Sequence, residues 1–261
     1  MRSAGALLPD ERRRLVAERL REDGSVSVAA LEEEFGISPM TARRDLAELE
    51  RHGIARRTHG GAVLPALSSH EDSFFQRLEV AVAAKERLAE AAVALLAPGE
   101  TLFVDSSTTG YFAARRIVRQ NLRCTLLTNA VPIMELVCEA EAPQVELMGV
   151  GGTLRKLTRS FVGPQAVVGI EAHFADQVLF SVRGLTEDGH LTDPDPLEAE
   201  IKRDMIRRAR RAVLLVDGSK FDRAALSVIA PVSDVAIILA ADVDERALTP
   251  LMRAGIDVRQ V

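Results

Sequence analysis

The stretch SVAALEEEFGISPMTARRDL, residues 27–46, carries the local signals that decide the fold of the N-terminal part of the chain. We expect Ser27 to cap a helix over residues 28–35 and Gly36 to allow the tight turn after it. Ser38 is expected to cap the next helix, with Pro39 at its first position, where a missing N–H costs nothing. Two short helices joined by a three-residue turn that contains glycine are typical of a helix-turn-helix.

A helix is also expected before this stretch. Asp10 is positioned to cap it, Leu15, Val16 and Leu20 would face inward, and Gly24 would end it. The helix that follows Ser38 would end at Gly53. The N-terminal segment is therefore predicted to hold three helices.

The third helix has an apolar and a polar face. At 100° per residue, Ala42, Leu46 and Leu49 share one side and should pack on the first two helices. The opposite side presents the residues Met40, Thr41, Arg44 and Glu48, with Arg43 at the flank. Arginine reads guanine with two hydrogen bonds and threonine contacts bases or phosphates, so this face suits a major groove. A solvated helix face is the alternative interpretation.

The residues after this helix favour the DNA-binding interpretation. Residues 54–57 and 62–64 are expected to form a β-hairpin that turns through Gly60 and Gly61. A hairpin at this place is a wing, and its basic tip would rest on phosphates or in the minor groove. The candidate DNA-binding residues are Ser27, Ser38, Met40, Thr41, Arg43, Arg44, Arg56, Arg57 and His59.

Composition bounds the rest of the interpretation. The 261 residues are 47% hydrophobic and 27% charged, which excludes global disorder, and no apolar run is long enough for a membrane helix. The net charge of −5 alone argues against nucleic-acid binding, but residues 1–65 hold eleven arginines against eleven acids and are neutral. No signal peptide is visible, so we expect a cytoplasmic protein. Cys124 and Cys138 have no metal-ligand spacing and are expected to be ordinary buried thiols.

The remainder of the chain predicts an α/β domain with a mainly parallel sheet, because apolar β-type runs alternate with helical stretches. The predicted domains are a winged helix-turn-helix at 1–65, a linker at 66–75 and an α/β domain at 76–261, with a long helical pattern from Glu71 to Ala97. The predicted strands are 101–105, 124–128, 144–149, 177–182, 212–217, 235–239 and 257–261. The predicted helices are 110–119, 131–139, 196–210 and 244–254.

The carboxyl ends of the predicted strands are rich in hydroxyls, glycines and cations. Ligands bind at this edge of such sheets, and a helix N-terminus there suits a phosphate. Turn glycines and capping residues are the alternative interpretation of each loop. The candidate effector-binding residues in these loops are Asp105, Ser106, Ser107, Thr108, Thr109, Thr128, Asn129, Gly151, Gly152, Arg155, Arg183 and Lys220.

Glu198 and Lys202 complete the candidate set. They lie four residues apart on a predicted helix. They form either an ordinary surface pair or two groups that face the ligand cleft.

The sequence resembles the DeoR family of bacterial transcription regulators over nearly its whole length. The residues that carry the resemblance are Gly36-Ile37-Ser38, Thr41, Arg43-Arg44-Asp45-Leu46, His59-Gly60-Gly61-Ala62, Lys85, Asp105-Ser106, Thr108-Thr109, Thr128-Asn129, Gly151-Gly152, Arg155, Glu198, Lys202 and Asp217-Gly218-Ser219-Lys220. The resemblance implies a sensor domain similar to ribose-5-phosphate isomerase and the CoA-transferase group, with a phosphorylated sugar or related phosphometabolite as effector. Ser107 stands where the family usually has glycine, which is expected to tighten the phosphate loop.

Two functions remain open at this point. The first is a DNA-binding regulator, by resemblance a repressor of a carbohydrate-metabolism operon, without a cofactor and acting as a homo-oligomer (dimer or tetramer) on double-stranded operator DNA. The second is an enzyme, such as a phosphosugar isomerase or an acyl-CoA transferase, with an added DNA-binding module. The enzyme needs a general base, and the chemically eligible residues are Asp105, Asp176, Glu198 and Lys220. No spacing forces them into a catalytic pair, so we expect a regulator.

Overall fold

A computed structural model describes residues 9–23, 25–51, 54–58, 60–63 and 71–261 of the chain. The chain divides into two compact units, residues 1–73 and residues 74–261. Residues 66–70 of the predicted linker lie outside the described residues, and Phe74 already begins a helix. Within the described residues, no helix is both long enough and apolar enough to cross a membrane.

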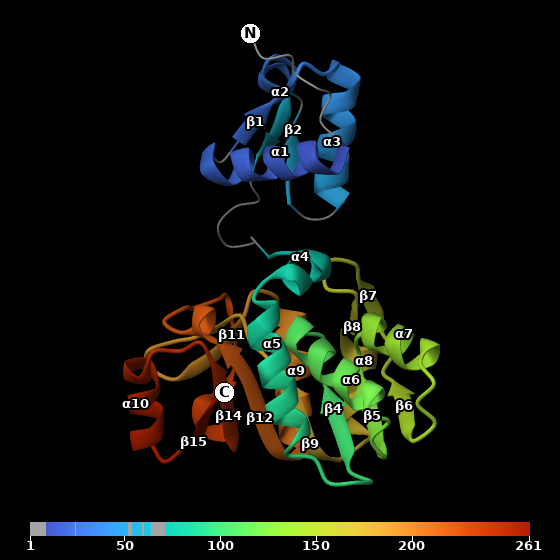
Figure 1. The fold of residues 1–261 in the computed structure, drawn as a ribbon, viewed down its shortest axis with the longest axis vertical. Helices are drawn as coiled ribbons and strands as arrows, with labels where there is room; N and C mark the ends of the chain where they lie inside the picture. Colours follow the sequence, from blue (N-terminus) through green and yellow to red (C-terminus); the bar gives the residue numbers. More distant parts are fainter. Residues whose placement is uncertain (1–8, 24, 52–53, 59, 64–70) are drawn as a thin grey trace. The chain divides into compact units, whose positions relative to one another are not determined.

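The N-terminal unit combines three helices with a small antiparallel sheet (Figure 1). Its strand order is β1-β3-β2. The elements are α1 (Pro9–Asp23), β1 (Ser25–Ser27), α2 (Val28–Phe35), α3 (Pro39–Arg51), β2 (Arg56–Thr58) and β3 (Gly61–Val63). Its core contains Val16, Leu20, Leu31, Ala42, Leu46 and Leu49.

The capping residues predicted from the sequence set the helix boundaries here. The Ser27 hydroxyl accepts a hydrogen bond from the Ala30 N–H at 3.0 Å, and α2 then ends at Gly36 with φ +62°. Gly36 adopts this left-handed conformation without the steric penalty that a Cβ would bring. The Ser38 hydroxyl accepts from the Thr41 N–H at 3.3 Å, as predicted for the start of α3. The helix-turn-helix is therefore confirmed.

Three details of the N-terminal prediction are wrong. The first helix begins at Pro9, so Asp10 lies inside α1 rather than at its cap. The hairpin strands are shifted, and Gly61 belongs to β3 instead of the turn. Strand β1 was not expected, and it pairs with β3. Three residues are too few to produce a periodic pattern, which is why the sequence did not reveal it. Gly24, Gly53 and His59 lie outside the described residues.

The C-terminal unit is built on a seven-stranded sheet in which every neighbouring pair is parallel, as predicted. The strand order is β15-β14-β12-β9-β4-β5-β6. The strands are β4 (Thr101–Val104), β5 (Cys124–Thr128), β6 (Val145–Gly149), β9 (Ala175–Phe180), β12 (Ala209–Asp217), β14 (Ile237–Ala241) and β15 (Asp257–Gln260). All seven predicted strands are present, with ends displaced by a few residues.

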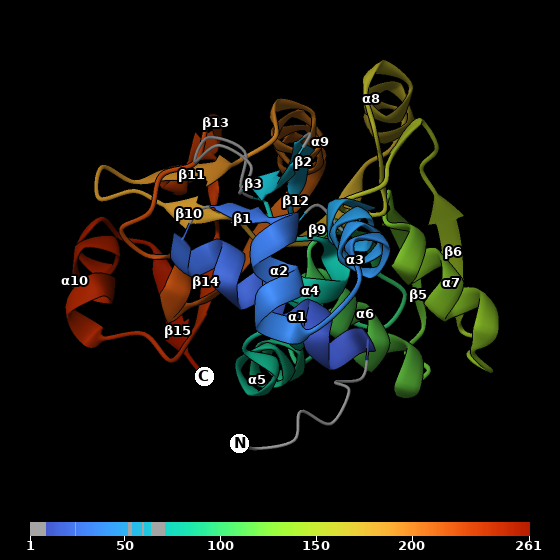
Figure 2. The ribbon, with the colours of Figure 1, turned by 90° about the horizontal axis from the view of Figure 1, so that it is seen from above.

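Helices cover both faces of this sheet and form three layers (Figures 1 and 2). One face packs Leu102, Leu126 and Leu179 against α5, α6 and α7, and the other packs Phe103, Leu127 and Phe180 against α8, α9 and α10. This alternation follows from the opposite orientation of successive side chains on a strand. The helices are α4 (Phe74–Glu79), α5 (Val82–Val93), α6 (Thr108–Arg119), α7 (Val131–Glu139), α8 (Pro164–Glu171), α9 (Pro196–Arg208) and α10 (Glu245–Arg253).

The long helix predicted from Glu71 to Ala97 is two helices. Ala81, with φ +51°, separates α4 from α5, and an L-residue in this left-handed conformation interrupts a helix. The sequence analysis also missed α8 and five short strands. These strands form a hairpin, β7 (Thr153–Arg155) with β8 (Ser160–Val162), and a small antiparallel sheet of β10 (Gly184–Leu185), β11 (His190–Asp193) and β13 (Ser227–Pro231).

The strand order reverses between β4 and β9. Strands β5 and β6 continue on one side of β4, whereas β9, β12, β14 and β15 continue on the other. Open α/β sheets bind ligands outside the carboxyl ends of their strands at such a switch point. Asp105 follows β4 and Ser181 follows β9, so both lie at this switch point.

The two cysteines differ from each other. Cys124 is buried, as predicted, and burial raises the pKa of its thiol to about 11. Cys138 is exposed, so the prediction that it is buried is wrong. Only Pro132 and Ile133 of α7 are buried, which leaves the later part of this short helix toward solvent.

Candidate functional site

The outer face of α3 is the candidate DNA-contact surface. Ala42, Leu46 and Leu49 are buried, as the helical projection predicted. Met40 is 73% exposed and both Arg43 and Arg44 are exposed. The half-buried Thr41 lies 3.0 Å from the Ser38 hydroxyl, oxygen to oxygen. Two exposed guanidinium groups thus extend from the first turns of α3, whose start is capped by Ser38.

An ion pair fastens the wing to this helix. The Arg57 Nε lies 2.7 Å from a Glu50 carboxylate oxygen, and the Arg57 backbone N–H donates to the other oxygen at 2.9 Å. These hydrogen bonds, the backbone one first, hold the pKa of Glu50 below its usual value. Arg56 lies on β2, and the predicted tip residue His59 lies outside the described residues. The wing and α3 thus share a polar contact that orients one against the other.

Asp45 has a role that the sequence analysis did not assign. Its carboxylate is buried and lies 2.6 Å from Arg12 Nε and 3.2 Å from Arg13 Nε, both on α1. The carboxylate joins α1 to α3 directly beneath the exposed arginines. The helical projection contained a signal for this role, because Asp45 falls beside Ala42 and Leu49 on the inner side.

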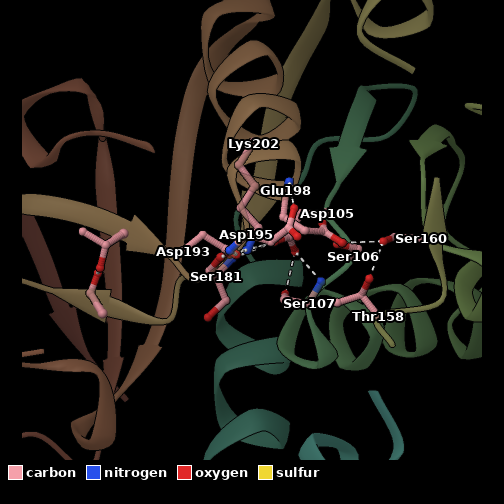
Figure 3. Close-up of polar contacts among 12 residues, drawn as sticks. Asp105, Ser106, Ser107, Thr158, Ser160, Ser181, Asp193, Asp195, Glu198 and Lys202 are labelled. Atoms are coloured by element: carbon pink, nitrogen blue, oxygen red, sulfur yellow. Dashed lines mark hydrogen bonds and ion pairs between the residues drawn. The ribbon is translucent and has the colours of Figure 1, made fainter. Parts of the chain in front are cut away.

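In the C-terminal unit, a buried polar cluster occupies the switch point (Figure 3). Asp105 has no exposed surface, and one of its oxygens accepts from the Ser107 N–H and hydroxyl at 3.2 and 2.5 Å. The other accepts from the Ser181 N–H at 3.3 Å and lies 3.5 Å from Lys202 Nζ. Burial raises the pKa of Asp105, and Lys202 opposes the shift. Ser107 also caps α6 by accepting from the Gly110 N–H at 2.9 Å, so it tightens the loop as expected.

Glu198 and Lys202 both point into this cluster. Glu198 accepts from the hydroxyls of Ser106 at 2.8 Å and Ser160 at 2.5 Å. Lys202 donates to Asp193 at 2.7 Å and to the Ser181 carbonyl at 2.9 Å. Burial alone would lower the pKa of Lys202, but the surrounding carboxylates outweigh it and raise this pKa. Since both side chains are buried, the surface-pair interpretation is wrong.

Several other predicted effector residues make contacts within the protein. The Thr128 hydroxyl donates to the Val104 carbonyl at 2.7 Å, and the Asn129 amide donates to the Phe161 carbonyl at 2.9 Å. The Asn129 side-chain oxygen is buried without a hydrogen-bond partner among the described residues. Arg155 Nε donates to Asp195, the N-cap of α9, at 3.0 Å.

The remaining candidates surround the cluster on nearby loops. Thr108 and Thr109 are buried in the first turn of α6. Gly151 is exposed and Gly152 half-buried, between β6 and β7.

Cations gather at the same edge of the sheet. Burial lowers the pKa of Lys220, the nearby Asp217 carboxylate opposes the shift, and the positive charges of Arg183, Arg77 and Arg223 add to it. Burial also lowers the pKa of Lys85 to about 8, with a contribution from Lys220. The sequence analysis named Lys220 and Arg183 but did not place Lys85 or Arg77 in the site. Arg77 lies on α4, which the sequence did not distinguish from α5.

Comparison with known proteins identifies both units. Residues 12–67 match the family model of the DeoR-like helix-turn-helix domain, and residues 80–241 match that of the DeoR C terminal sensor domain. The transcriptional repressor AccR of Agrobacterium fabrum is 32% identical over 88% of this chain and 88% of its own length. The L-fucose operon activator of Escherichia coli K12 is 30% identical over 90% of this chain and 95% of its own. Ribose-5-phosphate isomerase of Methanocaldococcus jannaschii aligns with a TM-score of 0.39, at 16% identity over 54% of each chain.

A helix-turn-helix with an exposed basic face, joined to an α/β domain with its own polar interior, defines a DNA-binding transcription regulator. The chain belongs to the DeoR family of these regulators. Both relatives are named as regulators of transcription, and this protein is likewise a transcription regulator.

Proposed function

We propose that the protein represses a carbohydrate-metabolism operon and that a phosphorylated sugar or related phosphometabolite, bound by the C-terminal domain, controls it. The observation that carries this proposal is the group of cations around Lys220 and Lys85 at the switch point. Burial and mutual repulsion both disfavour the protonated lysines and so lower their pKa values. A bound dianion would offset both effects, because its charge stabilises the protonated form. The regulator would need no cofactor besides this effector.

The polar cluster supports a sugar as the remainder of the effector. Burying an unpaired oxygen such as that of Asn129 costs free energy, and a ligand hydroxyl would satisfy it. Gly151 lies in the loop after β6, where a glycine allows close approach of a small molecule, and Arg155 ends β7. The L-fucose operon activator among the relatives also points to carbohydrate metabolism.

DNA binding is proposed to use Arg43 and Arg44 in the major groove and the wing on the phosphates. A single module of this size binds operators weakly, so we propose that a homo-oligomer, dimer or tetramer, presents two copies to a symmetric site. The effector would act by favouring one arrangement of the two DNA-binding domains, which is a coupling free energy between two sites.

The test uses the full-length protein on the DNA upstream of its own gene. Arg44→Ala should weaken DNase protection about tenfold to hundredfold, because one well-placed arginine pair with guanine contributes about 1–3 kcal/mol. The control Arg14→Ala removes an exposed arginine of α1 that pairs with Glu18, and it should leave protection unchanged. Normal protection by Arg44→Ala would contradict the proposed recognition helix.

The effector is sought by a thermal-shift screen of phosphorylated sugars, since a ligand that binds the folded state raises its melting temperature. A hit should release the wild-type protein from DNA. Lys220→Ala should lose this response and keep DNA binding, whereas Arg253→Ala, on the exposed last turn of α10, should retain both. An unchanged response in Lys220→Ala would remove this lysine from the site.

A further inference from the structure

Arg77 presents two buried guanidinium nitrogens that the described residues leave unsatisfied. Its Nε and one terminal nitrogen have no exposed surface and no hydrogen-bond partner among the described residues. Burying charged donors without acceptors is costly, so a native structure that keeps such a group calls for an explanation.

The surroundings of Arg77 are those of the candidate site. Its charge acts on Lys85 and Lys220, whose pKa values it helps to lower, and on Asp193. The Asp193 carboxylate is already paired with Lys202, whose Nζ lies 2.7 Å from one of its oxygens. Arg77 therefore lies among other cations, where Asp193 is paired with Lys202 and Asp217 acts on Lys85 and Lys220. Two of its guanidinium nitrogens still have no acceptor among the described residues.

The backbone of Arg77 is fastened to the same site. Lys85 Nζ donates to the carbonyl of Arg77 and to that of Val80, the latter at 2.6 Å. The Thr108 hydroxyl, in the first turn of α6, lies 3.5 Å from the Arg77 carbonyl oxygen. Ala81, in the left-handed conformation, separates α4 from α5. Helix α4 is thus a short separate element, held by its contacts with the site.

We propose that Arg77 binds the anionic group of the effector and that this contact makes α4 the element that responds to occupancy of the site. This inference rests on the proposed function, because it assumes a phosphorylated effector. A guanidinium offers two parallel donors that match two phosphate oxygens, and Lys220 would share the same dianion. In the chain, α4 directly follows the segment that leaves the DNA-binding domain, so a ligand that orders α4 acts at the entry to the sensor domain.

The first test measures melting temperature with inorganic phosphate as the probe, against chloride at equal ionic strength, on the full-length protein. Phosphate should raise the melting temperature of the wild type. Arg77→Met should lose this increment, with about tenfold to hundredfold weaker phosphate binding, because hydrogen bonds to a charged group are lost. Arg77→Lys keeps the positive charge but not the two parallel N–H donors. Its phosphate-dependent rise in melting temperature should lie between those of the wild type and Arg77→Met. Arg119→Met, at the exposed end of α6, should behave like the wild type.

The melting temperature without phosphate separates binding from a structural role. Since two guanidinium nitrogens of Arg77 have no acceptor among the described residues, Arg77→Met should melt at the wild-type temperature or above it in chloride. A large drop in chloride with an unchanged phosphate increment would show that Arg77 only supports the fold, and it would overturn the inference. If Lys220→Ala loses the increment while Arg77→Met keeps it, the inference is wrong and the proposed function stands. If phosphate does not stabilise the wild type, the phosphorylated effector itself is wrong.

The second test addresses α4 directly. Backbone amide exchange of residues 74–79 should slow at least threefold when phosphate is added to the wild type, and it should not change in Arg77→Met. Exchange that stays the same in the wild type, despite a phosphate-dependent rise in melting temperature, would overturn the assignment of α4 as the responding element.

Discussion

At the scale of single residues, spacing indicates which side chains meet but not in which environment they meet. Glu198 and Lys202 have the spacing of a surface pair, yet both are buried, because α9 turns this face toward the switch point. The sequence contains no local signal for this orientation. It depends on Ser106 and Ser160, which lie 92 and 38 residues away from Glu198 in the chain. Long-range partners of this kind explain why the sequence indicated these residues as a group and not their individual contacts.

Lys85 gives a pH-dependent prediction. Its pKa in the folded protein is about 8, against 10.5 for an ordinary lysine, because it is buried and close to Lys220. Between these two values the unfolded chain binds a proton that the folded protein does not, so unfolding becomes harder as pH rises. The urea midpoint of the wild type should therefore increase from pH 8 to pH 10 relative to that of Lys85→Met. Parallel pH profiles of the two proteins would show that Lys85 is ordinarily solvated.

At the scale of elements, local capping signals were the most reliable guide. Helices α2 and α3 begin behind the predicted caps Ser27 and Ser38, and α9 begins where predicted, at Pro196. Helix α7 has its predicted bounds although no side chain caps it. The elements that were missed are short or lack a period. Strands β10, β11 and β13 have two to five residues, and their pairing depends on residues from 184 to 231. Such pairings are set by tertiary packing, which overrides local propensity.

The wing provides a test with a built-in control. A Cβ on Gly61 would lie 2.0 Å from the Val26 carbonyl oxygen of the neighbouring strand, whereas one on Gly60 would meet nothing within 4 Å. Gly61→Ala should therefore separate β3 from β1 and destabilise the N-terminal domain by about 1–3 kcal/mol, as overpacking does. Gly60→Ala should have little effect. Thermal unfolding followed by circular dichroism compares the two variants, and equal melting temperatures would contradict the observed strand pairing.

At the scale of the whole molecule, the charge distribution follows the division into two units. The acidic excess that produces the net charge of −5 lies entirely after residue 65, and the N-terminal segment is neutral, with five of its eleven arginines on α3 and β2 and five on α1. An acidic sensor domain weakens non-specific attraction to the DNA backbone, which leaves recognition to a few placed arginines. Net charge alone therefore gave the wrong indication about DNA.

The proposed homo-oligomer is tested by measuring the mass of the protein in solution. Light scattering of the full-length protein at micromolar concentration should give two or four times the chain mass of 28.3 kDa. Residues 74–261 form a compact unit with their own core, so the fragment should fold and keep the same number of copies. A full-length protein of single-chain mass, bound to its operator as a monomer, would refute the symmetric arrangement.

The late position of α9 along the chain has a consequence for synthesis. The N-terminal domain is complete once its short sheet has formed, and domains fold as they leave the ribosome. The polar cluster needs Lys202 and Glu198 from α9, so it assembles only after most of the sensor domain has been translated. A newborn chain thus completes its DNA-binding fold before the polar cluster of the proposed effector site exists. Truncated chains that end before α9 would keep the DNA-binding fold without this cluster.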